Sequence, residues 1–366
     1  MFKTNKKKIC IVATCLSQGG AERSSALLSK MLDGLGHEIH IVTVLSGVEY
    51  EYAGTLFNLG ALKDKKDTVL SRLDRLRLFK AFLKKQGFDL IIDNRARVQA
   101  YREFIITKFI YKMPTIYVVH SYNSDVTFTP YNWLNSYLYK NEWMTFVSDA
   151  AHQKFKKAFG LNRTRTIHNG FDLKTINHQA NEAIPYENYI LFYGRIDDEV
   201  KNLKLLLDAF KQSRLSESHV KLLLLGNGPD ENMVEAYAKQ LKIEAQVVFK
   251  GFVSNPYPYV KQAKFTVLTS RFEGFPMVIP ESLALGTPVV SVNYNVGLNE
   301  VITNRHNGLV VENYNVPALA EAMNSFIFDA TLYANCKANA KQSVERFSIE
   351  HVTKDWQNLL KSIDEN

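Results

Sequence analysis

The sequence predicts an α/β protein built from two doubly wound parallel sheets. Short apolar segments alternate with helical patterns along nearly the whole chain, which is typical of parallel sheets covered by helices. Twelve segments qualify as strands, more than one open sheet holds comfortably. At 366 residues the chain is also long for a single hydrophobic core, so two domains are expected.

The expected strands are runs of β-branched, aromatic and aliphatic residues bounded by turn residues. In the first half they are residues 9–14, 39–45, 90–92, 115–120, 144–147 and 164–167. In the second half they are residues 189–193, 220–225, 246–249, 265–268, 288–292 and 309–311. Helical patterns are expected at residues 22–35, 72–85, 203–212, 230–241, 317–327 and 352–363.

The boundary between the two domains is expected near residues 173–188. The turn sequence His168-Asn169-Gly170 closes the first half, and a polar stretch then leads to the buried strand at residues 189–193. The last helix carries Trp356, Leu359, Leu360 and Ile363 on one face, so it should pack against a domain rather than extend into solvent.

The net charge also differs between the two halves of the chain. The whole chain has a net charge of +8, but residues 1–175 hold 27 basic and 15 acidic side chains, and residues 176–366 hold 18 and 22. A basic first half suits phosphates, nucleic acid or an anionic membrane. Cys10, Cys15 and Cys336 form neither a disulfide framework nor a metal spacing, which favours a reduced, cytoplasmic protein.

The N-terminus has one alternative interpretation. Lys6 to Lys8 followed by the apolar residues 9–16 imitates a short signal peptide. We interpret it as the first strand, because the apolar run leads directly into the strand-to-helix turn around Gly19-Gly20. No apolar run approaches the length that spans a bilayer.

Two carboxylates stand eight positions apart in the second half. Glu273 falls in a Gly/Pro loop after the strand 265–268, and Glu281 falls in the first turn of the helix that follows. A carboxylate at such a place accepts hydrogen bonds from sugar or ribose hydroxyls. Taken alone, the pair could equally be a solvated loop charge and a helix-start charge.

The sequence Glu273-Gly274-Phe275-Pro276, ending on Glu281 and followed by Ala284-Leu285-Gly286-Thr287-Pro288, resembles the paired-Glu motif of GT4-type retaining glycosyltransferases. This family, which includes bacterial polysaccharide and glycolipid enzymes, has the GT-B fold, in which two Rossmann-like domains face across a cleft. The resemblance implies an acceptor-binding domain at residues 1–175 and a nucleotide-sugar-binding domain at residues 176–349. It also implies that the final helix, residues 350–366, packs back on the first domain.

A cation pair follows the strand 189–193. Arg195 and Lys201 could hold a diphosphate leaving group, Arg as a planar fork and Lys as a point charge. They could also be surface cations that pair with Asp197 to Glu199. The diphosphate-clamping pair of the family has the same pattern, which here is Gly194-Arg195, a short spacer and then Lys201-Asn202. We therefore expect these residues to clamp a diphosphate.

Two features of the first half are expected beside the donor sugar. His120 ends the strand 115–120, and a histidine or similar polar residue at this place in the family hydrogen-bonds the transferred sugar; a structural role is the alternative. Gly19 and Gly20 open the first helix, where glycine lets a phosphate or acceptor approach the backbone. A plain tight turn would have the same sequence.

The remaining candidates are loop residues at the carboxyl ends of strands, where doubly wound sheets bind ligands. The resemblance implies a nucleotide-binding set of Gly194, Asn227, Phe252, Val253, Gly274, Phe275, Pro276, Met277, Val278 and Glu281. One loop departs from the family, because Asn293 to Glu300 lacks the usual proline.

The resemblance also assigns roles. Arg195 and Lys201 stabilise the leaving diphosphate, Glu281 holds the ribose, and Glu273 with the backbone of residues 275–278 orients the sugar. Transfer is expected to retain anomeric configuration by a front-face route and to need no metal or other cofactor. UDP is favoured as the base, and GDP is the alternative.

The partners follow from the same family. We expect a nucleotide-sugar donor and a glycan or polyprenyl-diphosphate-linked acceptor, at a cytoplasmic location. The basic helix at residues 72–85 could bind the inner face of an anionic membrane or simply cover its own sheet. Aromatic residues 128, 131, 133, 137 and 139 could be core or meet an acceptor. No nucleic-acid motif accompanies the charge.

Two other functions remain open for a GT-B protein. A nucleotide-sugar epimerase or hydrolase would consume donor without an acceptor. A non-catalytic glycan- or membrane-binding protein would bind an acceptor and leave the donor intact. Fold alone does not separate these from a transferase.

Overall fold

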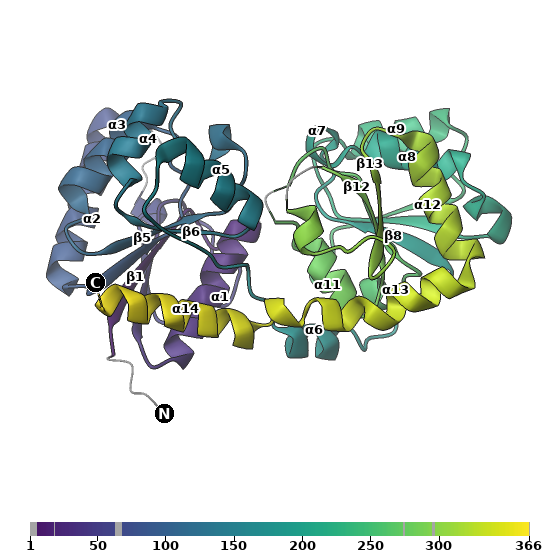
Figure 1. The fold of residues 1–366 in the computed structure, drawn as a ribbon. Helices are drawn as coiled ribbons and strands as arrows, with labels where there is room; N and C mark the ends of the chain where they lie inside the picture. The colour runs from purple at the N-terminus through teal and green to yellow at the C-terminus, as the bar shows by residue number, and fades with distance from the viewer. Residues whose placement is uncertain (1–5, 18, 63–67, 274, 295–296, 366) are drawn as a thin grey trace. The chain divides into compact units, whose positions relative to one another are not determined.

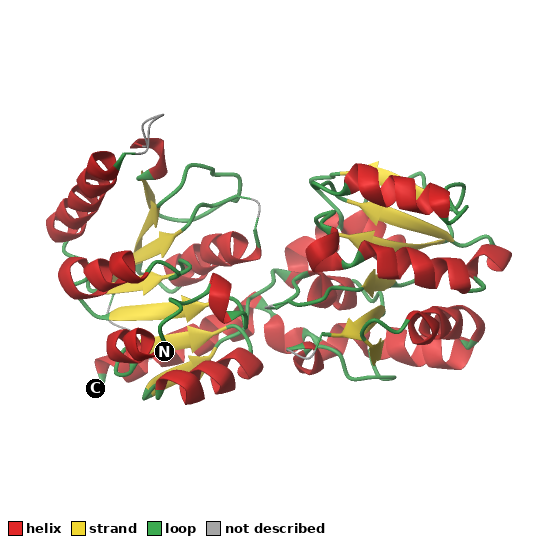
Figure 2. Ribbon diagram, turned by 90° about the horizontal axis from the view of Figure 1, so that it is seen from above, coloured by secondary structure: helices red, strands yellow, loops and turns green. Residues whose placement is uncertain are grey.

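The computed structural model describes residues 6–17, 19–62, 68–273, 275–294 and 297–365 (Figure 1). The chain divides into two compact units. The first comprises the chain up to Gly170 together with Ile349 onward, and the second runs from Phe171 to Ser348. Each unit is an α/β layer structure with one parallel sheet between helices, as Figure 2 shows, so the predicted fold class is confirmed.

The first unit contains a seven-stranded sheet in the order β3-β2-β1-β4-β5-β6-β7, with every neighbouring pair parallel. Its strands are β1 (Lys8–Ala13), β2 (Glu38–Thr43), β3 (Thr55–Asn58), β4 (Leu90–Asp93), β5 (Thr115–Val119), β6 (Trp143–Phe146) and β7 (Arg163–Thr166). Its helices are α1 (Gly20–Gly34), α2 (Val69–Gln86), α3 (Ala100–Ile105), the π-helical turn η2 (Ile106–Ile110), α4 (Asn132–Tyr139), α5 (Asp149–Phe159) and α14 (Ile349–Asp364).

Helices cover both faces of this sheet. Side chains from α2, η2, α4 and α5 join β1, β4, β5 and β6 in one buried cluster that includes Phe79, Leu138 and Phe155. The other face carries α1, and α14 packs against α1 (Figure 1). Trp356, Leu359 and Leu360 are buried in that contact layer, because the apolar face of α14 is turned inward.

The second unit contains a six-stranded parallel sheet in the order β10-β9-β8-β11-β12-β13. Its strands are β8 (Tyr189–Tyr193), β9 (Lys221–Leu225), β10 (Val247–Gly251), β11 (Thr266–Leu268), β12 (Val289–Asn293) and β13 (Gly308–Glu312). Its helices are α6 (Leu173–Gln179), α7 (Asp198–Lys201), α8 (Leu203–Gln212), α9 (Glu231–Gln240), α10 (Tyr257–Gln262), α11 (Val278–Ala284), α12 (Val316–Phe328) and α13 (Ala330–Ser343).

Each sheet has a point at which the winding reverses. In the first sheet the chain goes from β1 to β2 on one side, and β4 lies on the other side of β1. In the second sheet β9 and β11 flank β8 in the same way. Ligands of open α/β sheets bind beside the carboxyl ends of the strands at such a reversal. The segments that follow β1, β4, β8 and β11 are therefore the places to look for a site.

Candidate active site

Three loops meet at the carboxyl edge of the second sheet. The Gly194 amide donates to the Leu225 carbonyl at 2.9 Å, and the Gly226 amide donates to Gly251 at 2.9 Å. Gly226 has φ +141°, and a Cβ there would lie 1.9 Å from the Gly194 carbonyl oxygen, so only glycine allows this approach. The ends of β8, β9 and β10 are thereby held together, which brings the sequence-predicted Gly194 and Asn227 to one edge.

Lys201 and Glu273 form an ion pair beside that edge. The Lys201 Nζ lies 2.5 Å from Glu273 Oε1, and the two side chains are 18% and 15% exposed. The Ser270 hydroxyl donates to the same carboxylate oxygen at 2.7 Å. α7 presents the lysine, and the loop after β11 presents the carboxylate. The two predicted residues are thus partners of each other, each held by a charge-assisted hydrogen bond.

Arg195 is held far less firmly than Lys201. Its side chain is 70% exposed, and its nearest acidic partner is Asp197, at 3.6 Å between Nε and Oδ2. A long, exposed contact of this kind restrains a side chain weakly. Asp197 is itself engaged as the N-cap of α7, where its carboxylate accepts from the Val200 amide. Arg195 therefore extends from the edge into solvent.

Glu281 is a buried carboxylate in the first turn of α11, with 3% of its surface exposed. Two tyrosine hydroxyls lie 3.4 Å from its oxygens, that of Tyr193 at the end of β8 and that of Tyr257 at the start of α10. The Tyr193 hydroxyl also donates to the Val278 carbonyl at 2.7 Å. A buried carboxylate needs such polar neighbours, and they fix its position relative to the strand end.

The other predicted residues of the second unit differ in exposure. Phe252 is 71% exposed in the loop after β10, and Val253 next to it is partly exposed. Phe275 is buried and packs its ring against Phe171 and Phe347, so its side chain is structural. Pro276 is buried, while Met277 and Val278 are partly exposed. Gly274 lies outside the described residues. Two residues of the loop 293–300, which lacks the proline usual in the family, also lie outside them.

Tyr294 was not predicted from the sequence. It follows β12, and its buried hydroxyl has no hydrogen-bond partner within the described part of the chain. Burial raises the pKa of this phenol well above its usual value, and the charges of Glu273 and Glu300 act in the same direction. The phenol therefore stays neutral, and its hydroxyl remains available as a hydrogen-bond donor.

In the first unit a cavity of about 160 Å³ opens at the carboxyl ends of β1, β4 and β5. Its lining includes His120, Ser121, Arg95, Arg97, Asn94 and Glu22. The predicted His120 therefore faces a polar cavity at the reversal point of the first sheet. Gly19 and Gly20 are placed next to it, because the following residues Ala21 and Glu22 line it.

His120 is neutral in this cavity. Neither ring nitrogen has a hydrogen-bond partner among the described residues, although both are buried. Burial lowers the pKa of the imidazole to about 3, and the nearby Arg97 cation acts in the same direction. A neutral imidazole can donate or accept a hydrogen bond but binds a proton weakly. This environment suits contact with hydroxyls better than general-base chemistry.

Arg97 is the other functional candidate that sequence reasoning missed. Its side chain is fully buried, and its guanidinium donates to the carbonyls of Arg95 at 2.8 Å and Val118 at 2.7 Å. It thereby ties the end of β4 to β5, two residues before His120. The neighbouring Arg95 pairs with Asp93 and Glu103 in a second buried ion cluster. The sequence feature that could have identified Arg97 is the run of polar residues from Asn94 to Arg97, directly after a buried strand.

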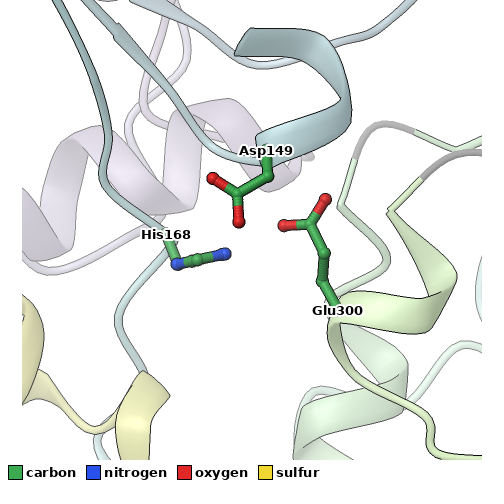
Figure 3. Close-up of side chains that lie close together, drawn as sticks. All are labelled: Asp149, His168 and Glu300. Atoms are coloured by element: carbon green, nitrogen blue, oxygen red, sulfur yellow. The ribbon is translucent and has the colours of Figure 1, made fainter. Parts of the chain in front are cut away.

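Figure 3 shows a further polar pair in the first unit, Asp149 at the start of α5 and His168 after β7. A carboxylate oxygen and a ring nitrogen of these residues lie within 4.8 Å. Asp149 also accepts from the Thr166 hydroxyl at 2.5 Å, which ties α5 to β7. Glu300, drawn in the same view, belongs to the second unit, so the pair alone is a structural contact of the first unit.

Two family models match the chain. Residues 18–175 match the model described as Glycosyltransferase Family 4, and residues 174–343 match the model described as Glycosyl transferases group 1. The junction of the two matches lies within a few residues of Phe171, where the two compact units meet in the sequence.

Relatives that match nearly the whole chain are also named as glycosyltransferases. A Campylobacter jejuni N-acetylgalactosamine-N,N'-diacetylbacillosaminyl-diphospho-undecaprenol 4-alpha-N-acetylgalactosaminyltransferase is 27% identical, covering 95% of this chain and 98% of its own. A second Campylobacter jejuni enzyme, a GalNAc-alpha-(1->4)-GalNAc-alpha-(1->3)-diNAcBac-PP-undecaprenol alpha-1,4-N-acetyl-D-galactosaminyltransferase, is 26% identical over 97% and 99%.

The structural similarity covers nearly the whole chain. A glycosyltransferase from Rickettsia africae superposes with a TM-score of 0.81 at 19% identity, covering 99% of this chain and 100% of that one. Anabaena HepE in complex with UDP superposes with a TM-score of 0.76 at 20% identity, covering 97% and 100%. At these identities the likeness establishes the fold.

Proposed function

Since the chain belongs to the GT4-type glycosyltransferases and is a hexosyltransferase of the GT-B fold, we propose that it moves a sugar from a nucleotide-diphosphate sugar to a glycan or polyprenyl-linked acceptor. The product would serve bacterial surface polysaccharide or glycan biosynthesis. One observation carries the donor half of this proposal: the Lys201–Glu273 pair and the buried Glu281 stand at one edge of the second sheet.

That edge has the chemistry of a donor site. Lys201 and Arg195 supply two cations for a diphosphate, and their different exposure suggests a fixed cation and a mobile one. Glu281, oriented by Tyr193 and Tyr257, is suited to accept hydrogen bonds from ribose hydroxyls. Glu273, oriented by Ser270, is suited to orient sugar hydroxyls. UDP is the favoured nucleotide, a choice that the HepE complex with UDP supports.

Transfer would retain the anomeric configuration. The acceptor oxygen would bond to the anomeric carbon on the face that the diphosphate leaves, and the acceptor proton would pass to the departing phosphate oxygen. Lys201 and Arg195 would stabilise the charge that develops there. The environment of His120 supports a role in hydrogen bonding the sugar rather than in taking up the proton. This route needs no metal ion.

The acceptor is the less constrained half of the proposal. Both Campylobacter jejuni relatives act on undecaprenyl-diphosphate-linked sugars by their names, and the chain covers nearly all of each of them. A lipid-linked acceptor would place the enzyme in the cytoplasm at the inner face of the membrane. Among the residues that the structure describes, no helix is long and apolar enough to cross a bilayer. The net charge of +12 over residues 1–175 supports contact with an anionic surface.

A thermal-shift panel tests the donor assignment. The purified protein is heated with UDP, GDP, ADP and their common sugar conjugates, with and without EDTA, because a ligand that binds the native state stabilises it by mass action. We expect a selective shift with uridine ligands that EDTA does not change. The selected donor is then incubated with and without lipid-linked acceptor. Donor consumption without acceptor would instead identify a hydrolase or epimerase, and no shift at all would favour a non-catalytic binding protein.

A further inference from the structure

The first unit carries a cluster of exposed aromatic side chains on α3, η2 and α4. We call this cluster the aromatic face; it consists of Tyr101, Phe104, Phe109, Tyr131, Trp133 and Tyr137. Trp133 is 70% exposed, and Tyr101 and Tyr137 are each more than 60% exposed. The aromatic face surrounds an apolar groove of about 590 Å³ between α3 and α4, which lie side by side in Figure 1. Contiguous exposed apolar surface of this kind marks an interaction site.

The aromatic face is not needed by the core of the unit. Phe128 and Tyr139, which come from the same stretch of sequence, are buried and join the central cluster. Trp133 and Tyr137 are exposed on α4, whereas Leu134 and Leu138 of the same helix are buried. α4 therefore contributes its leucines to the core cluster, while Trp133 and Tyr137 line the groove outside that cluster.

Cations border the aromatic face. The Lys108 Nζ lies 4.8 Å from the centre of the Tyr137 ring, and the Lys112 Nζ lies 6.0 Å from the centre of the Phe109 ring. Between Asn94 and Asn141, a range that spans the whole aromatic face, the sequence holds two carboxylates. Glu103 is fully buried and paired with Arg95, and Asp125 is exposed in the turn before α4. Glu142, after α4, is half-buried beside Lys108. The charged groups that lie over the rings of the aromatic face are therefore lysine ammonium groups.

The neighbouring helix α2 also exposes apolar side chains among basic ones. α2 covers the same side of the sheet, and Phe79 from α2 contacts the Tyr111 ring just after η2. The outer side of α2 exposes Leu70, Leu73 and Leu78 among its arginines and lysines. Cations with long apolar stems between exposed leucines are suited to the boundary between lipid headgroups and acyl chains.

We propose that the aromatic face is the surface by which this protein lies on an anionic lipid bilayer. Tyr and Trp have an apolar ring and a polar tip, and they settle at the level of the headgroups, while Lys108 and Lys112 meet the lipid phosphates. A second copy of the same face would bring like charges together, which argues against self-association there. The proposal deepens the proposed function, because a membrane surface is where a lipid-linked acceptor is found.

Vesicle binding tests the proposal without donor or acceptor. The intact protein is sedimented with phosphatidylcholine vesicles and with vesicles that also contain phosphatidylglycerol. We expect binding to the anionic vesicles, and about tenfold or more weaker binding for the double variant Trp133→Ala/Tyr137→Ala. Lys108→Gln/Lys112→Gln should weaken binding mainly at low salt. Phe328→Ala is the matched control, because Phe328 is 46% exposed in the second unit with the Arg214 guanidinium 4.5 Å above its ring.

Two further measurements separate the outcomes. Addition of anionic vesicles should shift the emission of the exposed Trp133 to shorter wavelength, a change that is absent in Trp133→Phe. The UDP thermal shift should be equal in all variants. If the wild-type protein does not bind vesicles but is still stabilised by UDP, the membrane-surface inference alone is overturned. If the protein binds vesicles but no nucleotide raises its melting temperature, the membrane-surface inference holds and the proposed function is wrong. A lipid-free dimer that Trp133→Ala/Tyr137→Ala abolishes would assign the aromatic face to a second copy and overturn the proposal.

Discussion

Lys201 and Arg195 carry the same charge but differ in how firmly the fold holds them. Lys201 is mostly buried against Glu273, and Arg195 reaches into solvent beside Asp197. Preorganised charge stabilises a transition state at little cost of reorganisation, so Lys201→Ala should lower kcat by about 10²–10³-fold. Arg195→Ala should lower it by about tenfold, because an exposed cation with one long contact contributes less. Initial rates at saturating donor measure both.

Lys211→Ala provides the control for this comparison. Lys211 is an exposed lysine in the last turn of α8 in the same unit, so its loss changes the net charge equally without touching the edge of the sheet. If both cation variants turn over like this control, the assignment of a diphosphate clamp is wrong.

Single residues were predictable where a short local pattern carried the chemistry. Arg195, Lys201, Glu273 and Glu281 follow strands in local sequence, and the structure brings them to one edge. Tyr257 and Tyr294 could not be found in that way, because each comes from a different loop and meets the site only through the order of the strands. Their roles, like those of all site residues, stay proposals.

Elements were predictable where apolar residues had a clear period. Every expected strand is present within about two residues, since a strand buried on both faces appears as a continuous apolar run. β3 was missed because Thr55–Asn58 is a short edge strand with partly exposed residues. The helix at residues 72–85 was expected to show one cationic side. Among the residues of α2 whose burial is described, only Phe79 and Leu83 are buried, and leucines are exposed as well.

The loop contact between β8 and β9 gives a test at the scale of an element. Gly226→Ala places a methyl group 1.9 Å from the Gly194 carbonyl at a backbone angle that L-residues rarely adopt. Strain of this kind costs about 1–3 kcal/mol, and the two loops must separate to relieve it. We expect the stabilisation by the nucleotide to fall strongly while the circular dichroism spectrum keeps its α/β shape.

Gly34→Ala is the matched substitution for Gly226→Ala. A Cβ at Gly34 meets nothing within 4 Å, and this residue ends a helix in the other unit. Its nucleotide-induced shift should equal that of the wild type. Equal shifts in both variants would show that the joined loops do not form the nucleotide site.

At the scale of the whole molecule the two units differ in chemistry. The carboxyl edge of the second sheet gathers carboxylates and cations around Lys201, whereas the polar cavity of the first sheet holds a neutral histidine beside buried arginines. Sequence composition indicated this division through the uneven charge of the two halves. It could not indicate that Arg97 is buried, because a polar run after a strand has the composition of an exposed loop.

The buried histidine makes the stability of the first unit depend on pH. Below about pH 6.5 the imidazole of the unfolded chain takes up a proton, whereas in the fold the pKa of His120 is about 3. The unfolded state then binds more protons, so stability falls as the pH falls from about 6.5 towards 3. The loss should be about 2 kcal/mol between pH 7 and pH 5.

His120→Gln should remove this part of the acid sensitivity, because glutamine has no proton to gain. Calorimetric unfolding of both proteins at pH 7 and pH 5 gives the difference between their two pH dependences. Glu22, whose pKa burial raises in the same cavity, acts in both proteins and cancels in that difference. We expect the variant to lose about 2 kcal/mol less than the wild type on acidification, whatever its stability at pH 7. Parallel losses would mean that the folded protein accepts the proton on His120, and that this ring is open to solvent rather than held neutral beside Arg97.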